Sequence, residues 1–138
     1  MKILVATDGS PAAAEAGRVG LELAAREDAS VAFLHVAQPG PDSEAVATSA
    51  AGENDLRRQA ARGATLGVSC TLELVVGEIA ETIVAHGRAI GADLIVVGSR
   101  GRSTAAGTLL GTVSRAVLRT ADRPVLIVRG RTQPTAGN

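Results

Sequence analysis

Aromatic residues and cysteines are nearly absent from this sequence. Its 138 residues include one phenylalanine, Phe33, and no tryptophan or tyrosine, so a core must be built from alanine, valine, leucine and isoleucine. Cys70 is the only cysteine, which excludes an intrachain disulfide and a metal centre of several thiolates. We expect it to be a small buried residue. Because there are no aromatic platforms on which bases could stack, we expect no nucleic-acid partner.

Long hydrophobic runs are lacking as well. The apolar runs extend over only a few residues, far below the roughly 20 that cross a bilayer. Asp8 interrupts the first of them before it could resemble a signal peptide. We therefore expect no membrane association and a cytoplasmic location.

Neither sign of charge is in excess over the whole chain, but the charges are unevenly distributed. The formal net charge is zero, yet residues 1–98 carry seven basic and thirteen acidic side chains, and residues 99–138 carry seven basic and one acidic. A basic segment attracts phosphorylated ligands. Arg100 and Arg102, which lie between glycines, are the best-placed members; Arg115, Arg119 and Arg123 are expected on the solvated face of a helix.

Length and the order of elements predict one α/β domain. The chain has the usual size of a single domain. We assign residues 1–130 to it and expect the tail 131–138, rich in threonine, glycine and proline, to be disordered. Apolar runs predict strands at 2–6, 31–36, 69–76, 93–97 and 124–128. One helix is expected to start with Ser10 as N-cap and Pro11 at its first position, and others to cover 54–66, 78–90 and 112–121.

Strands that alternate with helices form right-handed βαβ units and a parallel sheet. We therefore expect a doubly wound, five-stranded parallel sheet with helices on both faces. The succession of elements resembles flavodoxin-like and adenine-nucleotide-hydrolase-like folds, and this resemblance implies the strand order 3-2-1-4-5. The stretch between Gln38 and Asn54 shows little periodicity and is expected to be a surface loop. Ligands bind such sheets outside the carboxyl ends of the strands, where the strand order reverses. Asp8 follows the first strand and Gly98 ends the fourth, so both are expected on that rim.

Spaced glycines and hydroxyl residues follow the fourth strand. Gly98 and Gly101 lack a Cβ and would let backbone N–H groups approach an anion. Gly111-Thr112 opens a helix whose free N–H groups favour negative charge, and Thr112 and Ser114 add hydroxyl donors. A single glycine pair is commonly only a turn, but two glycine sites separated by nine residues predict a phosphate-binding loop.

Three familiar motifs do not account for this loop. A Walker A loop needs a lysine directly after a glycine, and the only lysine is Lys2. Where a dinucleotide-binding fingerprint would follow the first strand, the sequence has Thr7-Asp8-Gly9-Ser10 instead. The G-x-S-x-G nucleophile elbow is also missing.

The remaining pattern, Gly98-x2-Gly101-x9-Gly111-Thr112, closely resembles that of the universal stress protein family. The resemblance extends over nearly the whole chain: the opening segment 3–10, the strand ending at 34–36, the run 91–98 and the closing strand 124–128. Family members that bind ATP keep these glycines and the glycine–hydroxyl pair, and the other branch replaces them. The sequence is therefore similar to the ATP-binding branch.

Carried over position by position, the resemblance implies an adenosine end of the site. Ala6, Thr7 and Asp8 would line it, with Asp8 near the ribose. Val36 would flank the adenine, and Gly98 would lie by the ribose and the first phosphate. The less favoured alternative for Asp8 is an ordinary turn residue ahead of a helix.

The same resemblance implies a phosphate end. Arg100, Gly101 and Arg102 would wrap the phosphates. Amide and hydroxyl donors would come from the start of the next helix, at Gly111, Thr112, Val113 and Ser114. Mg²⁺ or Mn²⁺ accompanying ATP would be held chiefly by phosphate oxygens and water.

The function predicted from these features is that of an ATP-binding stress-response or signalling protein, in which bound nucleotide regulates conformation or partner choice. One alternative is a slow ATPase or a phosphotransferase. A second is a dimeric interaction module that does not use the nucleotide. Residues 98–114 contain no Asp, Glu, His or Lys to activate a nucleophile, so binding is favoured over catalysis.

The last expected strand bears on the oligomeric state. Residues 124–128 would form a sheet edge of consecutive apolar residues, and an exposed edge readily pairs with another chain. Universal stress proteins similarly dimerise through this edge. The resemblance therefore implies a homodimer with contacts from Val125 and Ile127, unless the tail after Gly130 covers the edge.

Overall fold

The computed structural model describes residues 1–38, 42–99 and 110–130, and for residues 42–49 the backbone alone. The strands are β1 (Lys2–Thr7), β2 (Ser30–Ala37), β3 (Cys70–Val76), β4 (Leu94–Gly98) and β5 (Val125–Val128). The helices are α1 (Pro11–Glu27), α2 (Asp42–Thr65), α3 (Ile79–Ile90) and α4 (Thr112–Thr120). The tail 131–138, for which disorder was expected, lies outside the described residues.

The five strands form one parallel sheet in the order β3-β2-β1-β4-β5, which confirms the predicted topology. β1 is central: Ile3 pairs with Val31 of β2 on one side and with Leu94 of β4 on the other. The chain adds β2 and β3 on one side of β1 and then crosses to add β4 and β5 on the other. The strand order therefore reverses between β1 and β4.

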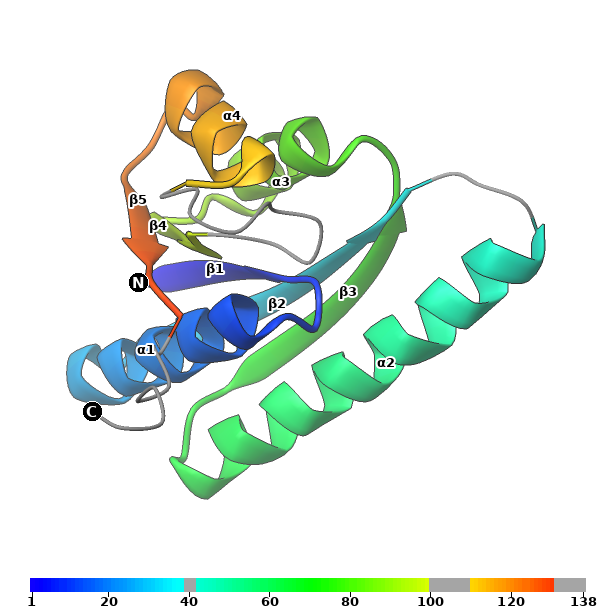
Figure 1. Ribbon diagram of the computed structural model, residues 1–138. Coiled ribbons are helices and arrows are strands. Elements are labelled where there is room, and N and C mark those ends of the chain that lie inside the picture. The colour runs from blue at the N-terminus through cyan, green and yellow to red at the C-terminus, as the bar shows by residue number, and fades with distance from the viewer. Residues whose placement is uncertain (39–41, 100–109, 131–138) are drawn as a thin grey trace, which may run out of the picture.

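Helices cover both faces of the sheet, as Figure 1 shows. Because successive side chains of a strand point to opposite faces, β1 contributes alternately to two cores. Val5 packs with residues of α1 and α2 around Phe33, and Leu4 packs with residues of α3 and α4. Within the described part of the chain no helix is long and apolar enough to span a bilayer.

Local sequence fixes the ends of α1 and α3. The Ser10 hydroxyl accepts a hydrogen bond from Ala13 N–H and Pro11 takes the first helical position, as predicted. The Glu78 carboxylate accepts from the second and third amides of α3, so that helix begins one residue later than expected. Gly91 ends α3 with φ 66°, in the left-handed region that glycine adopts without a steric penalty.

The prediction of a loop between Gln38 and Asn54 is wrong for most of that stretch, because α2 begins at Asp42 and runs unbroken to Thr65. Its first part carries several alanines, which have the highest helix propensity, and Asp42 and Glu44 lie in the first turn, where negative charge is favoured. Figure 1 shows this end of α2 extending beyond the sheet. A helix segment that covers no sheet needs no apolar stripe, which explains the missing periodicity.

Candidate functional site

A pocket opens at the carboxyl edge of the sheet, where the strand order reverses. This is the rim on which Asp8 and Gly98 were expected. Seven of the residues proposed from the sequence line it: Ala6, Thr7, Asp8, Val36, Gly98, Val113 and Ser114. Arg100, Gly101 and Arg102 lie outside the described residues, and Gly111 and Thr112 directly precede the lining residue Val113 in the chain.

One side of the pocket is a polar turn between β1 and α1. The Asp8 carboxylate accepts a hydrogen bond from Ser10 N–H at 2.8 Å, which orients it at the mouth of the turn. Ser10 in turn accepts from Ala13 N–H at 3.2 Å, and both of these residues also line the pocket. The turn therefore presents a carboxylate beside the N-terminus of a helix.

The opposite side is apolar, and most of it was missed at the level of sequence. Its additional lining residues are Leu34 from β2, Ile79 and Ile83 from α3, and Val97 from β4. The spacing of Ile79 and Ile83 puts them on one face of the expected helix. It predicts that this face is buried, but it does not indicate that the face lines a pocket. The pocket thus has a polar turn on one side and apolar side chains on the other.

The start of α4 faces the same pocket. Gly111 is the N-cap and, among the described residues, no side chain caps the first turn of this helix. Such a helix start keeps backbone N–H groups available for an anion. The Ser114 hydroxyl, expected as a phosphate donor, instead directs its proton between the carbonyl oxygens of Ser99 at 2.9 Å and Gly111 at 3.0 Å. Its one proton is thereby used in joining the two ends of the 99–111 segment.

Gly98 has a packing role that the sequence did not reveal. A Cβ at this position would lie 2.8 Å from the carbonyl carbon of Ala12 and 3.0 Å from its oxygen. The end of β4 thus passes directly against the first turn of α1. The missing Cβ lets these two pocket-forming elements approach each other.

Asp55 of α2 is a polar contact of the site that sequence reasoning did not identify. Its carboxylate accepts a hydrogen bond from the Thr7 hydroxyl across 48 positions of sequence. Odd-numbered residues of β1 face α1 and α2, so Thr7 lines the pocket but directs its hydroxyl toward α2. The spacing of the expected helix 54–66 carried no signal that singled out this carboxylate.

Within the described residues no group of three His, Cys, Asp or Glu side chains could hold a metal ion. Among the described residues that line the pocket, Asp8 provides the single carboxylate. This donor set fits a divalent cation only if a bound ligand supplies most of the oxygens.

Comparison with known proteins gives consistent matches. The model of the universal stress protein family matches residues 1–129. Universal stress protein YxiE of Bacillus subtilis is 33% identical over 148 residues, which cover 93% of this chain and 98% of that protein. Universal stress protein MJ0531 of Methanocaldococcus jannaschii is 30% identical over 138 residues, 93% of this chain and 81% of that protein.

A solved structure shares the fold. The crystal structure of a universal stress protein in complex with cAMP superposes with a TM-score of 0.78 at 29% identity, covering 95% of this chain and 98% of that one. The structural similarity therefore extends over nearly the whole chain.

Proposed function

Because this chain belongs to the universal stress protein family, we propose that it binds an adenine nucleotide, ATP with Mg²⁺ or Mn²⁺, in the pocket at the carboxyl edge of β1 and β4. Bound nucleotide then regulates the conformation of the protein or its choice of partner. The similar protein solved with cAMP supports an adenine nucleotide as the ligand.

The observation that carries the proposal is the division of this pocket into an apolar wall and two polar ends. The wall of Leu34, Val36 and Ile83 suits the flat face of a base. Asp8 offers a carboxylate oxygen to sugar hydroxyls. The first turn of α4, which no described side chain caps, offers N–H groups to phosphate.

Arg100 and Arg102 complete the phosphate end in this proposal, since they lie in the chain between β4 and α4. Their charge and the start of α4 would neutralise a triphosphate together. The metal ion would be held chiefly by phosphate oxygens and water, because Asp8 is the only carboxylate among the described lining residues.

Regulation is favoured over hydrolysis on chemical grounds. Rapid phosphoryl transfer uses a group that orients or deprotonates the attacking oxygen. The described lining residues include no histidine or lysine, and Asp8, which the proposal assigns to the sugar, is their only carboxylate. A slow ATPase is the alternative that the measurement below distinguishes.

The test is to denature freshly purified protein and analyse the released small molecules by mass spectrometry. Gly101→Glu places a negative charge in the phosphate loop, and Asp8→Asn weakens the proposed sugar contact. Glu27→Gln, on an exposed residue at the far end of α1, is the matched control.

ATP released from the wild type and the control, and lost from Gly101→Glu, would support the proposal. Its ATP-to-ADP ratio after incubation would separate a regulatory site from a hydrolase. If none of the proteins releases nucleotide and added Mg-ATP does not raise the melting temperature, the nucleotide proposal fails and a dimeric interaction module is favoured.

We also propose a homodimer through β5. β5 is an edge strand that pairs only with β4 among the described strands, and Val125 and Ile127 are half-buried. An edge of this kind can pair with a second copy. Light scattering should give a dimer mass for the wild type and for Leu72→Glu, on the opposite edge strand β3. Ile127→Glu should give a monomer mass, and a monomeric wild type would refute the proposal.

A further inference from the structure

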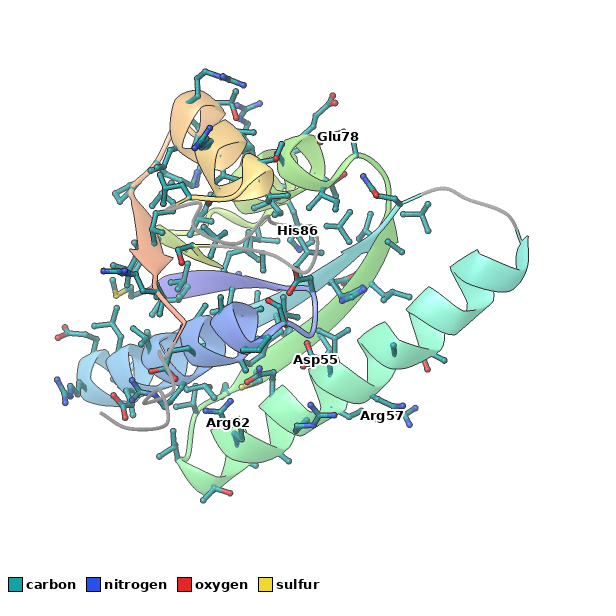
Figure 2. The ribbon with its side chains drawn as sticks, in the orientation of Figure 1. Asp55, Arg57, Arg62, Glu78 and His86 are labelled. Atoms are coloured by element: carbon teal, nitrogen blue, oxygen red, sulfur yellow. The ribbon has the colours of Figure 1, made fainter. Side chains whose placement is uncertain are left out.

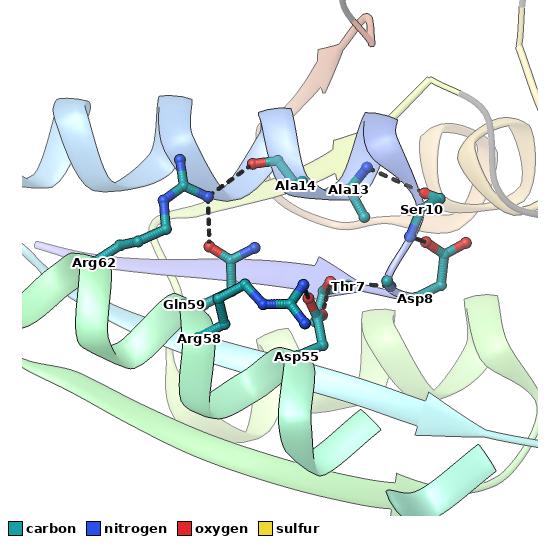
Figure 3. Close-up of polar contacts among 10 residues, drawn as sticks. Thr7, Asp8, Ser10, Ala13, Ala14, Asp55, Arg58, Gln59 and Arg62 are labelled. Atoms are coloured by element: carbon teal, nitrogen blue, oxygen red, sulfur yellow. Dashed lines mark hydrogen bonds and ion pairs between the residues drawn. The ribbon is translucent and has the colours of Figure 1, made fainter. Parts of the chain in front are cut away.

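The buried carboxylate of Asp55 is the most unexpected polar group near the pocket. Asp55 is 5% exposed and lies on the face of α2 that meets the sheet. Figure 2 shows it directed toward the sheet, whereas Arg57, two residues later, points to solvent. Its hydrogen-bond donor is the hydroxyl of Thr7, at the end of β1 (Figure 3).

Burying this carboxylate is unfavourable unless its oxygens are satisfied. Its cationic neighbour, Arg58, is 4.0 Å away and its side chain is 71% exposed, so this ion pair is weak. Of these two contacts, the hydrogen bond from Thr7 is the stronger compensation. An apolar residue would pack this helix face at lower cost, as Leu56 does next to it. Packing alone thus gives no reason for an acid at this position.

The hydrogen bond fixes how the Thr7 hydroxyl can act. A threonine hydroxyl has one proton and two lone pairs. The proton is donated to Asp55, so the oxygen is left as an acceptor, and Gly9 N–H donates to it at 3.4 Å. Thr7 and Gly9 are the residues directly before and after Asp8. Through the Thr7 hydroxyl, Asp55 therefore holds the turn that contains Asp8.

The helix that carries Asp55 is itself tied to α1. Gln59 lies one turn further along α2 and is 1% exposed. Its side chain packs directly over Gly17 of α1: a Cβ added at Gly17 would lie 2.6 Å from the Gln59 amide oxygen. Arg62 donates to that oxygen at 3.1 Å and to the Ala14 carbonyl at 3.4 Å (Figure 3). These contacts hold α2 against α1 one turn away from Asp55, so the position of the Asp55 carboxylate relative to β1 is fixed.

We propose that Asp55 is a positioning residue for the sugar end of the nucleotide site. Through Thr7 and the Gly9 amide it fixes the turn that aims the Asp8 carboxylate at the ribose hydroxyls. It thereby sets the preference of the site for a ribonucleotide over a nucleotide without those hydroxyls. This inference rests on the proposed nucleotide binding and adds a residue of α2 to it.

The test compares the affinities for AMP and for 2′,3′-dideoxy-AMP, which lacks both sugar hydroxyls, by calorimetric titration of the full chain. Asp55→Asn keeps the side-chain shape but removes the charge, which about halves the strength of the hydrogen bond. Thr7→Val removes the hydroxyl. Glu53→Gln, an exposed acid two residues away on α2, is the matched control.

The wild type is expected to bind AMP more tightly than the dideoxy nucleotide. In Asp55→Asn this preference should fall by about fivefold, the effect of roughly 1 kcal/mol of hydrogen bonding. The double variant Thr7→Val with Asp55→Asn should lose no more of this preference than Thr7→Val alone, because both substitutions break the hydrogen bond between Thr7 and Asp55. Glu53→Gln should keep the wild-type ratio. A purely structural role would lower both affinities equally, and that result would overturn the proposal.

Amide hydrogen exchange provides a readout that does not depend on nucleotide. Gly9 N–H should exchange faster in Asp55→Asn than in the wild type, while amides in the centre of β1 keep their rates. If the wild type binds neither nucleotide, the proposed function fails, and faster exchange at Gly9 would still support positioning of the turn by Asp55. Unchanged exchange at Gly9 would refute the inference.

Discussion

Replacing Gly98 with alanine should destabilise the protein even without a ligand. Gly98 is the last residue of β4, in an extended conformation that alanine adopts without strain. The added methyl would lie 2.8 Å from the carbonyl carbon of Ala12, 3.0 Å from its oxygen and 3.0 Å from its Cβ. Two of these three atoms belong to the backbone of α1, so no side-chain rotation can relieve the contact. Either α1 or the end of β4 must move.

The size of the effect follows from these distances. Carbon atoms attract most strongly at about 3.5–4.0 Å, so the closest contact is short by at least about 0.7 Å. Overpacking of this kind costs about 1–3 kcal/mol. Alanine restricts the unfolded chain relative to glycine, which offsets about 0.4–1 kcal/mol. The net loss of unfolding free energy is about 1–2 kcal/mol, or a melting temperature lower by roughly 3–8 °C for a domain of this size.

The measurement is urea and thermal unfolding of nucleotide-free protein, with Gly87→Ala as the matched control. Gly87 is a buried glycine of α3, and a methyl there would first meet the Cδ1 of Ile95 at 3.0 Å, the end of a flexible side chain. Alanine also gains about 1 kcal/mol of helix propensity over glycine. Gly87→Ala should therefore be neutral or slightly stabilising.

The two explanations for Gly98 give opposite results. If close packing against α1 requires the glycine, the nucleotide-free variant is less stable than the wild type. If the glycine serves only to let the backbone approach a ligand, nucleotide affinity falls and nucleotide-free stability is unchanged. The second result would refute the packing argument.

Two further predictions concern titrating groups outside the pocket. Hydrogen bonds from Arg123 and, to a lesser extent, Arg88 lower the pKa of Asp122 to about 2. The stabilisation that these ion pairs give the folded protein should therefore be present above about pH 4 and be lost as the pH falls toward 2. An NMR titration of the Asp122 carboxyl with a midpoint near pH 4 would contradict the ion pairs. Burial raises the pKa of the Cys70 thiol, so at pH 8 it should react with a thiol reagent more slowly in the folded protein than in urea, and equal rates would show that the thiol is accessible.

Much of the fold could be predicted because its signals are local. The short apolar runs give the strands, and their alternation with helices gives the parallel sheet and its handedness. Ser10-Pro11 and Gly91 mark helix ends through the chemistry of a few adjacent residues. α2 was the exception. Periodicity reports burial, and the first part of this helix extends beyond the sheet, so only its alanines and the two acidic residues of its first turn indicated a helix.

The polar rim of the pocket was also accessible from sequence, because the carboxyl ends of parallel strands meet at one edge. That rule placed Asp8 and Gly98 together although 90 residues separate them. The apolar wall was not accessible. Ile79 and Ile83 follow the same pattern as any buried helix face, and only the packing of α3 beside Leu34 makes them part of a pocket.

The sequence by itself determined the elements, the class of sheet and the edge at which a ligand would bind, since each depends on neighbouring residues or on a general rule of chain handedness. Only the tertiary structure decided that Thr7 reaches Asp55, that Ser114 donates to the Ser99 carbonyl and that Gly98 packs on Ala12. Those contacts depend on the position that each helix takes along the sheet when the two cores pack. No local pattern in the chain encodes that distance.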